Sequence, residues 1–343
     1  VDCFNELGEV TSYPNTVTAQ EVAERVGDAD VIVCNKAPMK EESLKDCPNV
    51  KLICELATGY DNCDLAYCKS RGIKVANVVD YSTAMVAQHT FTLALALSQD
   101  VDNNMENFRI VVQPVVSAGD GRAIGGEVLL RWSFEGKDVS PGIFIPLLEE
   151  NGLIQRVGRW VFEQAVSTCV RLHAYDPAFY LTFNVSLHQL SDSTLLPFMK
   201  ETLGKYNLKG SSLVAELTES ALDEHPEQLN HFVQECEKMG LYIALDDFGS
   251  GYSSLRMLLQ YPSSIIKLDR SLAQEMTESE SKMNFIRSIV FACHQFGKTV
   301  CMEGVEQAEQ NEIILNTGCD MIQGYYYFRP MELRDLYRLV SQM

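Results

Sequence analysis

Several features that point to particular classes of protein are scarce or missing in this sequence. Positive charge is scarce, because 28 Lys and Arg stand against 47 Asp and Glu, for a formal net charge of -19. Sequence-independent binding to a nucleic-acid polymer depends on clusters of cations that release counterions from the phosphates. The charge balance therefore argues against a nucleic-acid polymer as a partner. An anionic substrate would need metal ions or local Arg and Lys side chains.

A long apolar run is also missing. The most apolar stretch, residues 83 to 97, is interrupted by Gln88, His89 and two Thr, and is shorter than the roughly 20 residues that a membrane span requires. We interpret it as a buried helix in which His89 is a packed or capped residue rather than a catalyst, and we expect no membrane segment. The chain starts at Val1 without a signal-peptide pattern, which we interpret as a fragment of a longer protein.

Paired cysteines are absent as well. The eleven Cys are scattered singly through apolar stretches, with no CxxC pair and no Cys/His spacing typical of a zinc site. This pattern favours a reducing, cytoplasmic environment in which the thiols serve as small core residues.

What is present, from residue 109 onward, is an alternation of short β-rich runs with helical runs. The runs predict eight strands, near 109–116, 125–133, 180–187, 212–218, 242–247, 264–269, 298–303 and 319–323. Amphipathic stretches such as 226–239 and 282–296 lie between most of them. We therefore predict an α/β fold, a TIM-like (β/α)8 barrel. The link between the first two strands is too short for a crossover helix, so that pair should be an antiparallel hairpin.

The first hundred residues have a different rhythm. Short apolar strands are expected at 30–34, 52–56 and 74–78, separated by helical segments, which indicates a small α/β unit. The polar, acidic segment 100–107 is the best candidate for a boundary, although a helix across the junction would serve equally well. We therefore expect two domains, residues 1–99 and 100–343.

Polar residues recur where the predicted barrel strands end, at the side on which such barrels place their chemistry. They are Asn184, Glu216, Asp246, Asp247, Lys267, Glu303 and Gln323, with Glu127 and Arg131 on one face of an earlier strand. Taken singly, each has an ordinary structural explanation: an Asp at a strand end is more often a helix cap, and Lys267 could merely pair with Asp269. Together they would crowd negative charge into one cavity, which raises carboxylate pKa values or recruits cations.

Oxygen ligands of this kind suit Mg²⁺ or Mn²⁺ rather than Zn²⁺. Five carboxylates and one Asn suffice for two such ions, and a pair of ions can activate water and stabilise the leaving oxygen in a phosphoryl displacement. Lys267 could orient that water, and Arg131 could hold a phosphate oxygen near the metals. We expect Ca²⁺ to occupy such a site without supporting turnover, because its looser geometry suits in-line chemistry poorly.

These residues resemble the EAL domain, the bacterial cyclic di-GMP phosphodiesterase, over about 235 residues. The name motif reads Glu127-Val128-Leu129 here, with Val in place of Ala. The other matching segments are Gln113-Pro114, 140–154 (SPGIFIPLLEENGLI), Asn184-Val185-Ser186, 216–220 (ELTES), 246–254 (DDFGSGYSS), 267–269 (KLD), 303–306 (EGVE) and 323–325 (QGY). Ser250 stands where the family often has Thr, and Leu148 where a small residue is usual.

The resemblance implies a role for each matching residue. Glu127, Asn184, Glu216 and Asp246 would hold one metal, and Asp246, Asp247 and Glu303 would help to hold the second. Lys267 would assist the attacking water, and Gln323 would support the water or a metal ligand. Arg131 would grip a phosphate, while Gln113 would meet a guanine and Asp269 would belong to the substrate site. Glu219 resembles the residue that anchors the loop after Asp247.

Residues 1–99 resemble something else, the N-terminal part of the catalytic domain of a D-2-hydroxyacid dehydrogenase, which implies a truncated flavodoxin-like unit. The likeness spans residues 28 to 97, but no GxGxxG motif follows it and no NAD domain has room in the chain. No NAD is expected to bind, so oxidation of a D-2-hydroxyacid is the weakest of the functional hypotheses.

The leading hypothesis is hydrolysis of cyclic di-GMP to linear pGpG. The alternative is a receptor that binds cyclic di-GMP without cutting it. Receptors of the family usually lack some metal ligands or the Lys, and none is missing here, which favours the enzyme. The resemblance also implies that a homodimer could form through the EAL region.

Overall fold

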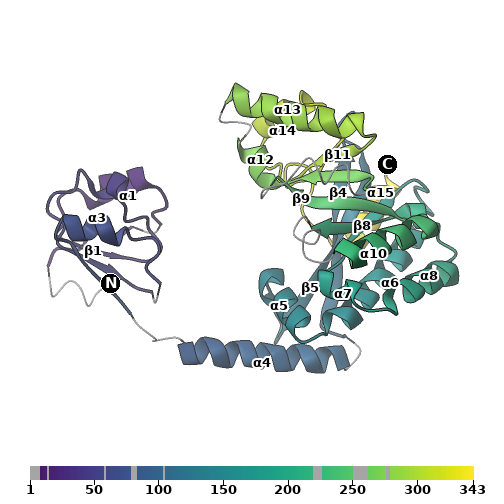
Figure 1. Cartoon of the computed structure of the whole chain (residues 1–343), viewed down its shortest axis with the longest axis horizontal. Coiled ribbons are helices and arrows are strands. Elements are labelled where there is room, and N and C mark those ends of the chain that lie inside the picture. The colour runs from purple at the N-terminus through teal and green to yellow at the C-terminus, as the bar shows by residue number, and fades with distance from the viewer. Residues whose placement is uncertain are drawn as a thin grey trace. The chain divides into compact units, whose positions relative to one another are not determined.

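The computed structural model spans the 343-residue chain and describes residues 8–13, 15–57, 59–78, 83–102, 105–218, 226–249, 262–275 and 279–343. Contacts divide the chain into two compact units, Val1–Phe91 and Thr92–Met343. Figure 1 shows both units. Within the described ranges, no helix combines the length and the apolar character needed to cross a membrane.

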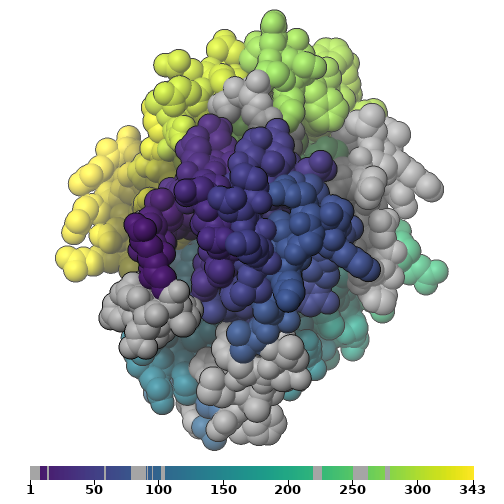
Figure 2. Space-filling model, turned by 90° about the vertical axis from the view of Figure 1, so that its left-hand side faces the viewer, coloured from purple at the N-terminus to yellow at the C-terminus, as the bar shows by residue number. Residues whose placement is uncertain are grey.

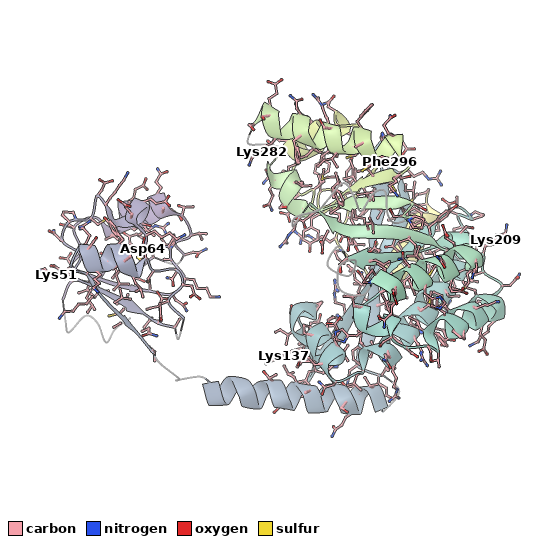
Figure 3. All side chains as sticks on the ribbon, in the orientation of Figure 1. Lys51, Asp64, Lys137, Lys209, Lys282 and Phe296 are labelled. Atoms are coloured by element: carbon pink, nitrogen blue, oxygen red, sulfur yellow. The ribbon has the colours of Figure 1, made fainter. Side chains whose placement is uncertain are left out.

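The first unit is a three-stranded parallel sheet with helices packed on it. Its strands are β1 (Val31–Cys34), β2 (Leu52–Glu55) and β3 (Lys74–Asn77), in that order across the sheet, and its helices include α1 (Ala19–Val26), α2 (Glu41–Leu44) and α3 (Leu65–Ser70). The three predicted strands are confirmed within one residue. Figure 2 shows this unit, purple to blue, as one closely packed body, and Figure 3 places Lys51 and Asp64 on its surface.

The second unit is a closed barrel of eight strands. They are β4 (Phe108–Ser117), β5 (Ala123–Phe134), β7 (Tyr180–Asn184), β8 (Leu213–Thr218), β9 (Tyr242–Phe248), β10 (Ile265–Leu268), β11 (Thr299–Met302) and β12 (Met321–Ile322). Strand β4 closes the barrel by pairing antiparallel with both β5 and β12, whereas the other neighbours run parallel. The predicted TIM-like barrel and its antiparallel first hairpin are therefore confirmed. A short strand, β6 (Lys137–Val139), extends the sheet beyond β5 and was not predicted.

Helices cover the outside of the barrel. They are α5 (Pro141–Glu150), α6 (Ile154–Leu172), α7 (Leu187–Leu190), α8 (Leu195–Tyr206), α10 (Pro226–Met239), α12 (Arg270–Glu275), α13 (Glu280–Gln295), α14 (Ala308–Leu315) and α15 (Leu333–Ser341). Helix α10 shows the pattern that places them. Pro226 opens it, and its buried residues Leu229, Phe232, Val233 and Cys236 recur at spacings of three and four, so one face packs on the sheet.

Helix α4 (Thr83–Asp102) corrects one expectation and decides between two others. The predicted helix exists, but its described part is buried on one side only, at Leu93, Leu97 and Val101, while Thr90 and Thr92 are exposed. Residues 100–102 continue the helix, so the second of the two possibilities for the junction, a helix across it, is the one that the structure has.

The end of α4 is fixed to the barrel. Asp100 accepts hydrogen bonds from Trp132 Nε1 at 2.6 Å and from Asn107 Nδ2 at 2.7 Å. Leu93, Leu97 and Val101 also join the hydrophobic core of the barrel. Asp100 thus anchors the end of the helix to the barrel, and the exact boundary between the two domains stays a prediction.

The described cysteines behave as the sequence predicts. All ten are free thiols, eight are buried and the other two are half-buried. Burial raises the pKa of thiols such as Cys169, to about 12, so they remain protonated core residues.

Candidate active site

Polar side chains are buried at one end of the barrel. Because parallel strands run in the same direction, their carboxyl ends and the loops that follow meet at a common mouth. Six buried polar residues that lie on, or directly after, separate strands are Gln113, Glu127, Glu216, Asp246, Lys267 and Gln323. Burial of such groups is unfavourable unless they find partners. Several of these residues are one another's partners.

Lys267 is the centre of this set. Its Nζ atom lies 2.7 Å from Glu303 Oε1 and 2.8 Å from Glu216 Oε1. The same atom lies 3.3 Å from Glu127 Oε2 and 3.3 Å from Asp246 Oδ1. The Lys267 side chain is only 4% exposed. One ammonium therefore faces four carboxylates brought from β5, β8, β9 and the end of β11, and the simpler pairing with Asp269 is not what the structure has.

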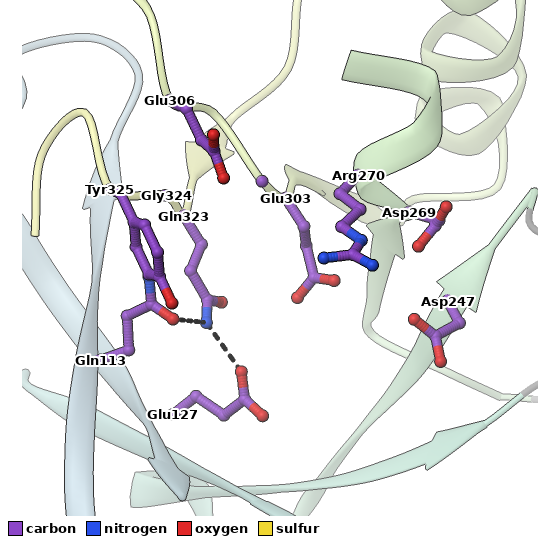
Figure 4. Close-up of a pocket in the computed structure, with 11 residues that line it drawn as sticks. Gln113, Glu127, Asp247, Asp269, Arg270, Glu303, Glu306, Gln323, Gly324 and Tyr325 are labelled. Atoms are coloured by element: carbon purple, nitrogen blue, oxygen red, sulfur yellow. Dashed lines mark hydrogen bonds between the residues drawn. The ribbon is translucent and has the colours of Figure 1, made fainter. Parts of the chain in front are cut away.

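Glu127 receives two further hydrogen bonds, one on each of its oxygens. Asn184 Nδ2 donates to Oε1 at 2.9 Å, and Gln323 Nε2 donates to Oε2 at 2.7 Å. Gln113 pairs with Glu127 across the β4–β5 hairpin, and its Oε1 accepts a longer bond from Gln323 at 3.4 Å. Figure 4 shows the two bonds made by Gln323. The amides fix the position of the Glu127 carboxylate.

The carboxylates differ in protonation because they differ in partners. Burial alone would raise the pKa of Glu127, but the charge of Lys267 and the bonds from Gln323 and Asn184 hold it below its ordinary value. Burial and the nearby Glu127 raise the pKa of Glu216 well above the ordinary value despite Lys267. Burial likewise raises the pKa of Glu303 to about 8. Without an added cation, one Lys cannot keep all these groups ionised.

Two consecutive carboxylates, Asp246 and Asp247, come to the same mouth through a backbone irregularity. Neighbouring residues of a strand normally point to opposite faces. Asp247, however, has a φ of 55°, in the left-handed region, and the pairing of β9 with β10 shifts register at this point. The shift lets both side chains approach Glu303.

The donors present fit hard metal ions. Carboxylate oxygens of Asp246, Asp247 and Glu303 lie within 4.8 Å of one another. Both oxygens of Glu216 and the Oδ1 atom of Asp246 are buried and accept no hydrogen bond of regular geometry among the described residues. Two of these oxygens, Glu216 Oε1 and Asp246 Oδ1, contact only the shared ammonium of Lys267 among the described residues, and Glu216 Oε2 contacts no donor there. A divalent cation would supply the positive charge that these buried oxygens lack. The cluster can therefore hold a metal.

A cavity of about 460 Å³ opens above this cluster. It is lined by Gln113, Glu127, Asp247, Asp269, Arg270, Glu303, Gly304, Glu306, Gln323, Gly324 and Tyr325. Figure 4 shows these side chains converging from separate strands and loops. Glu127, Asp247 and Glu303 belong both to the lining and to the carboxylate cluster, so a bound molecule would meet the cluster directly.

Only two of the three predicted substrate-binding residues line the cavity. Gln113 and Asp269 line the cavity, although Asp269 Oδ1 already accepts from Ser271 N at 2.9 Å. Arg131 does not belong to the lining, and its Nη1 donates to the carbonyl of Leu130 at 2.9 Å. Its role with phosphate stays a prediction. Glu219, the predicted loop anchor, lies outside the described residues, as does Ser250.

Sequence reasoning missed one charged residue of the cavity, Arg270. It directly follows the Lys-Leu-Asp segment, and nothing in its own pattern marks it, because an Arg after a strand is usually a solvated surface residue. Glu306, Gly304 and Tyr325 stand in segments that the sequence pointed out, but no role was inferred for them.

Comparison with known proteins identifies the barrel. A family model described as EAL domain matches residues 94–330. The chain belongs to the EAL domain family. The match begins within α4, six residues before the predicted boundary, and residues 1–93 lie outside it.

Known EAL proteins resemble the chain in sequence and structure. It is 32% identical over 245 residues to cyclic di-GMP phosphodiesterase PA2567 of Pseudomonas aeruginosa, covering 71% of this chain and 42% of that protein. It is 34% identical over 235 residues to cyclic di-GMP phosphodiesterase RocR of the same species, covering 68% and 60%. The solved PaMucR phosphodiesterase in complex with c-di-GMP superposes with a TM-score of 0.65 at 31% identity, covering 70% of this chain and 99% of that one. The chain thus spans less than two thirds of either curated relative.

Proposed function

We propose that the EAL domain of this chain hydrolyses cyclic di-GMP to linear pGpG. The observation that carries the proposal is the buried ammonium of Lys267 among four carboxylates, two of which, Glu127 and Glu303, line a cavity. The phosphodiesterase names of PA2567 and RocR support the same substrate.

The site would work with two Mg²⁺ or Mn²⁺ ions, held by Glu127, Asn184, Glu216, Asp246, Asp247 and Glu303. When bound, such ions lower the pKa of a coordinated water and neutralise charge on the phosphate oxygens. We further expect Ca²⁺ to inhibit, because it accepts irregular ligand geometry and fixes the reacting atoms less tightly.

The residues of the chain position and polarise the reactants. Lys267, fixed by its carboxylates, can donate a hydrogen bond to the attacking water and offset negative charge on the phosphate. Gln323 and Asn184 keep the Glu127 carboxylate in place. Gln113, at the cavity wall, has amide groups suited to the edge of a guanine.

The reaction balances without any further reagent. The oxygen of water forms a bond to phosphorus, the bond from phosphorus to one ribose 3′ oxygen breaks, and that oxygen takes up a proton. The cyclic molecule opens to a linear dinucleotide with a terminal phosphate, and no oxidant or cofactor such as NAD takes part.

The deciding experiment combines an assay of binding with an assay of product. Purified full chain is incubated with cyclic di-GMP and Mg²⁺ or Mn²⁺, and binding is measured in parallel by calorimetry. We expect pGpG from the wild type, and at least about a 100-fold loss for Glu127→Gln, because this carboxylate both faces Lys267 and offers metal ligands. Wild-type binding without any product would establish the receptor function instead.

A further inference from the structure

The cavity is strongly acidic apart from one side chain. Its lining contributes five carboxylates and a single cation, in the set Glu127, Asp247, Asp269, Glu303, Glu306 and Arg270. Cyclic di-GMP carries two phosphates, and only one of them is cleaved. If the carboxylate cluster with its ions takes the reacting phosphate, the other phosphate still faces acidic walls. It needs a cation of its own.

Arg270 is available for this purpose. Within the described residues its guanidinium makes no hydrogen bond or ion pair, whereas Arg109 bonds both Asp138 and Glu332, and Arg122 bonds Asp176. In Figure 4 the Arg270 guanidinium extends into the cavity between Glu303 and Asp247. An Arg in an acidic cavity that pairs with neither neighbour keeps all its donors for a ligand.

A glycine, Gly304, leaves space for the Cα and Cβ atoms of Arg270. Gly304 has a φ of +67°, and a Cβ atom there would lie 2.2 Å from Arg270 Cβ and 3.0 Å from its Cα. A side chain at this position would collide with the start of the α12 helix. The glycine therefore allows the loop after β11 to pass close to Arg270, which sets the guanidinium beside Glu303.

Other cations near the site are already engaged. Lys267 is not among the lining residues, and its ammonium contacts four carboxylates. Arg329 stacks over the ring of Tyr325, with its guanidinium carbon 4.4 Å from the ring centre. Arg131 does not line the cavity. Among the described lining residues, Arg270 alone combines positive charge with free donors.

We propose that Arg270 binds the phosphate of cyclic di-GMP that is not cleaved, and so makes the site selective for a diester with two phosphates. The inference rests on the proposed function of the same cavity. A guanidinium can meet phosphate oxygens with two parallel hydrogen bonds, which fixes orientation as well as charge. Arg270 is thus a binding residue and takes no part in proton transfer.

The test compares two substrates of different phosphate number. Arg270→Ala and Arg270→Lys are assayed in the full chain with cyclic di-GMP and with bis(p-nitrophenyl) phosphate, a diester with one phosphate. We expect Arg270→Ala to raise KM for cyclic di-GMP by about 10- to 100-fold, the loss typical of a charged hydrogen-bonding pair. The kcat for cyclic di-GMP and kcat/KM for the one-phosphate diester should change less than about threefold. Arg270→Lys should raise KM less than Arg270→Ala does, because Lys keeps the positive charge but cannot donate two parallel hydrogen bonds.

Binding provides a readout independent of turnover. The Kd of cyclic di-GMP, measured by calorimetry in Ca²⁺, should rise with Arg270→Ala by the same factor as KM. Arg122→Ala is the matched control, because it removes an exposed Arg that pairs with Asp176 and lines no part of the cavity. It should leave both KM and Kd unchanged.

The outcomes distinguish a failure of the proposed role of Arg270 from a failure of the proposed hydrolysis of cyclic di-GMP. If the wild type hydrolyses cyclic di-GMP but Arg270→Ala leaves its KM and Kd unchanged, or impairs both diesters equally, Arg270 does not bind the second phosphate. If the wild type hydrolyses neither diester, the proposed function fails, and the Kd comparison alone decides the role of Arg270.

Discussion

At the scale of single residues, the site depends on one ammonium shared by several carboxylates. The strand-end pattern predicted that Lys267 and these acids would meet, because alternation along parallel strands fixes which side chains share the mouth. The pattern could not predict that these carboxylates differ in the hydrogen-bond donors that they receive. Glu127 receives amide donors from Asn184 and Gln323, whereas Glu216 receives none of regular geometry, and this difference arises only when distant strands are assembled.

Removal of the ammonium should therefore destabilise the metal-free protein. Lys267→Met leaves several buried carboxylates without a cation, and breaking a buried ion pair from one side costs about 3–5 kcal/mol. We expect a loss of this size in urea denaturation with EDTA, and a smaller loss with Mg²⁺, which would replace the missing charge.

A second buried lysine, directly before β11, provides the control. Lys298 donates from Nζ to the carbonyl and hydroxyl of Ser263, both at 2.9 Å. Lys298→Met should destabilise the protein to the same extent with and without Mg²⁺. A Lys267→Met loss equally insensitive to Mg²⁺ would show that the carboxylates around it do not recruit cations.

Gly324, which lines the cavity, should not tolerate a larger residue. A Cβ atom at Gly324 would lie 2.1 Å from the carbonyl oxygen of Val305 and 2.4 Å from its nitrogen, and backbone atoms cannot rotate away. Gly324→Ala should cost about 1–3 kcal/mol of unfolding free energy, as overpacking does. Gly204→Ala is the counterpart, since Gly204 lies inside α8 with nothing within 4 Å and should gain roughly 0.5–1 kcal/mol. Equal thermal midpoints for the two variants would contradict this reading.

At the scale of elements, the first hairpin carries a charge conflict that a neighbouring strand offsets. Arg109 of β4 pairs directly with Arg131 of β5, and like charges in opposite positions are unfavourable. Asp138 of β6 bonds both guanidinium nitrogens of Arg109, at 2.7 and 3.1 Å. These bonds and one from Ser133 hold the pKa of Asp138 at about 2, below its ordinary value.

The depressed pKa of Asp138 gives a pH dependence of defined sign. Its stabilising contribution is fully present above the unfolded pKa near 3.8 and is lost as the pH falls toward about 2. Asp138→Asn should therefore lower the thermal midpoint at neutral pH, and the difference from wild type should shrink as the pH is lowered below 3.8. Asp335→Asn removes an exposed carboxylate 3.8 Å from Arg338 and should change the midpoint less at neutral pH. A constant Asp138→Asn difference down to pH 3 would contradict the linkage.

Strand positions could be predicted well from the sequence, while irregular backbone could not. Apolar runs predicted all eight barrel strands, because each is buried and bounded by polar residues. Strand β6 consists of Lys137, Asp138 and Val139, which carry no apolar alternation, so it left no signal. The left-handed Asp247 also escaped prediction, since an Asp after a strand adopts many conformations.

At the scale of the whole molecule, the EAL domain extends into helix α4. Leu93, Leu97 and Val101 are each at most 3% exposed and belong to the barrel core. Full burial of such a side chain contributes about 1.5–3 kcal/mol, so the three together approach the total stability of a domain. The polar composition around Asp100 left open whether a linker or a helix spans this junction, and the contact of Asp100 with Trp132 shows how the helix is fixed to the barrel.

Truncation tests where the domain begins. A fragment of residues 83–343 should unfold cooperatively and keep its cyclic di-GMP hydrolysis, whereas a fragment of residues 105–343 should be largely unfolded at 25 °C. Circular dichroism during urea titration measures the stability of both fragments. A stable 105–343 fragment would show that α4 is dispensable and that the predicted boundary was functionally right. The dehydrogenase likeness of residues 1–99 stays a prediction in either case.

The central claim is that the mouth of this barrel uses water to open cyclic di-GMP. The most direct measurement is a reaction of the full chain with cyclic di-GMP and Mg²⁺ in ¹⁸O-labelled water, analysed by mass spectrometry. The account predicts pGpG with one ¹⁸O atom in its terminal phosphate, and no product in EDTA. Recovery of intact, unlabelled cyclic di-GMP from protein that demonstrably binds it would contradict the account and leave the chain a receptor.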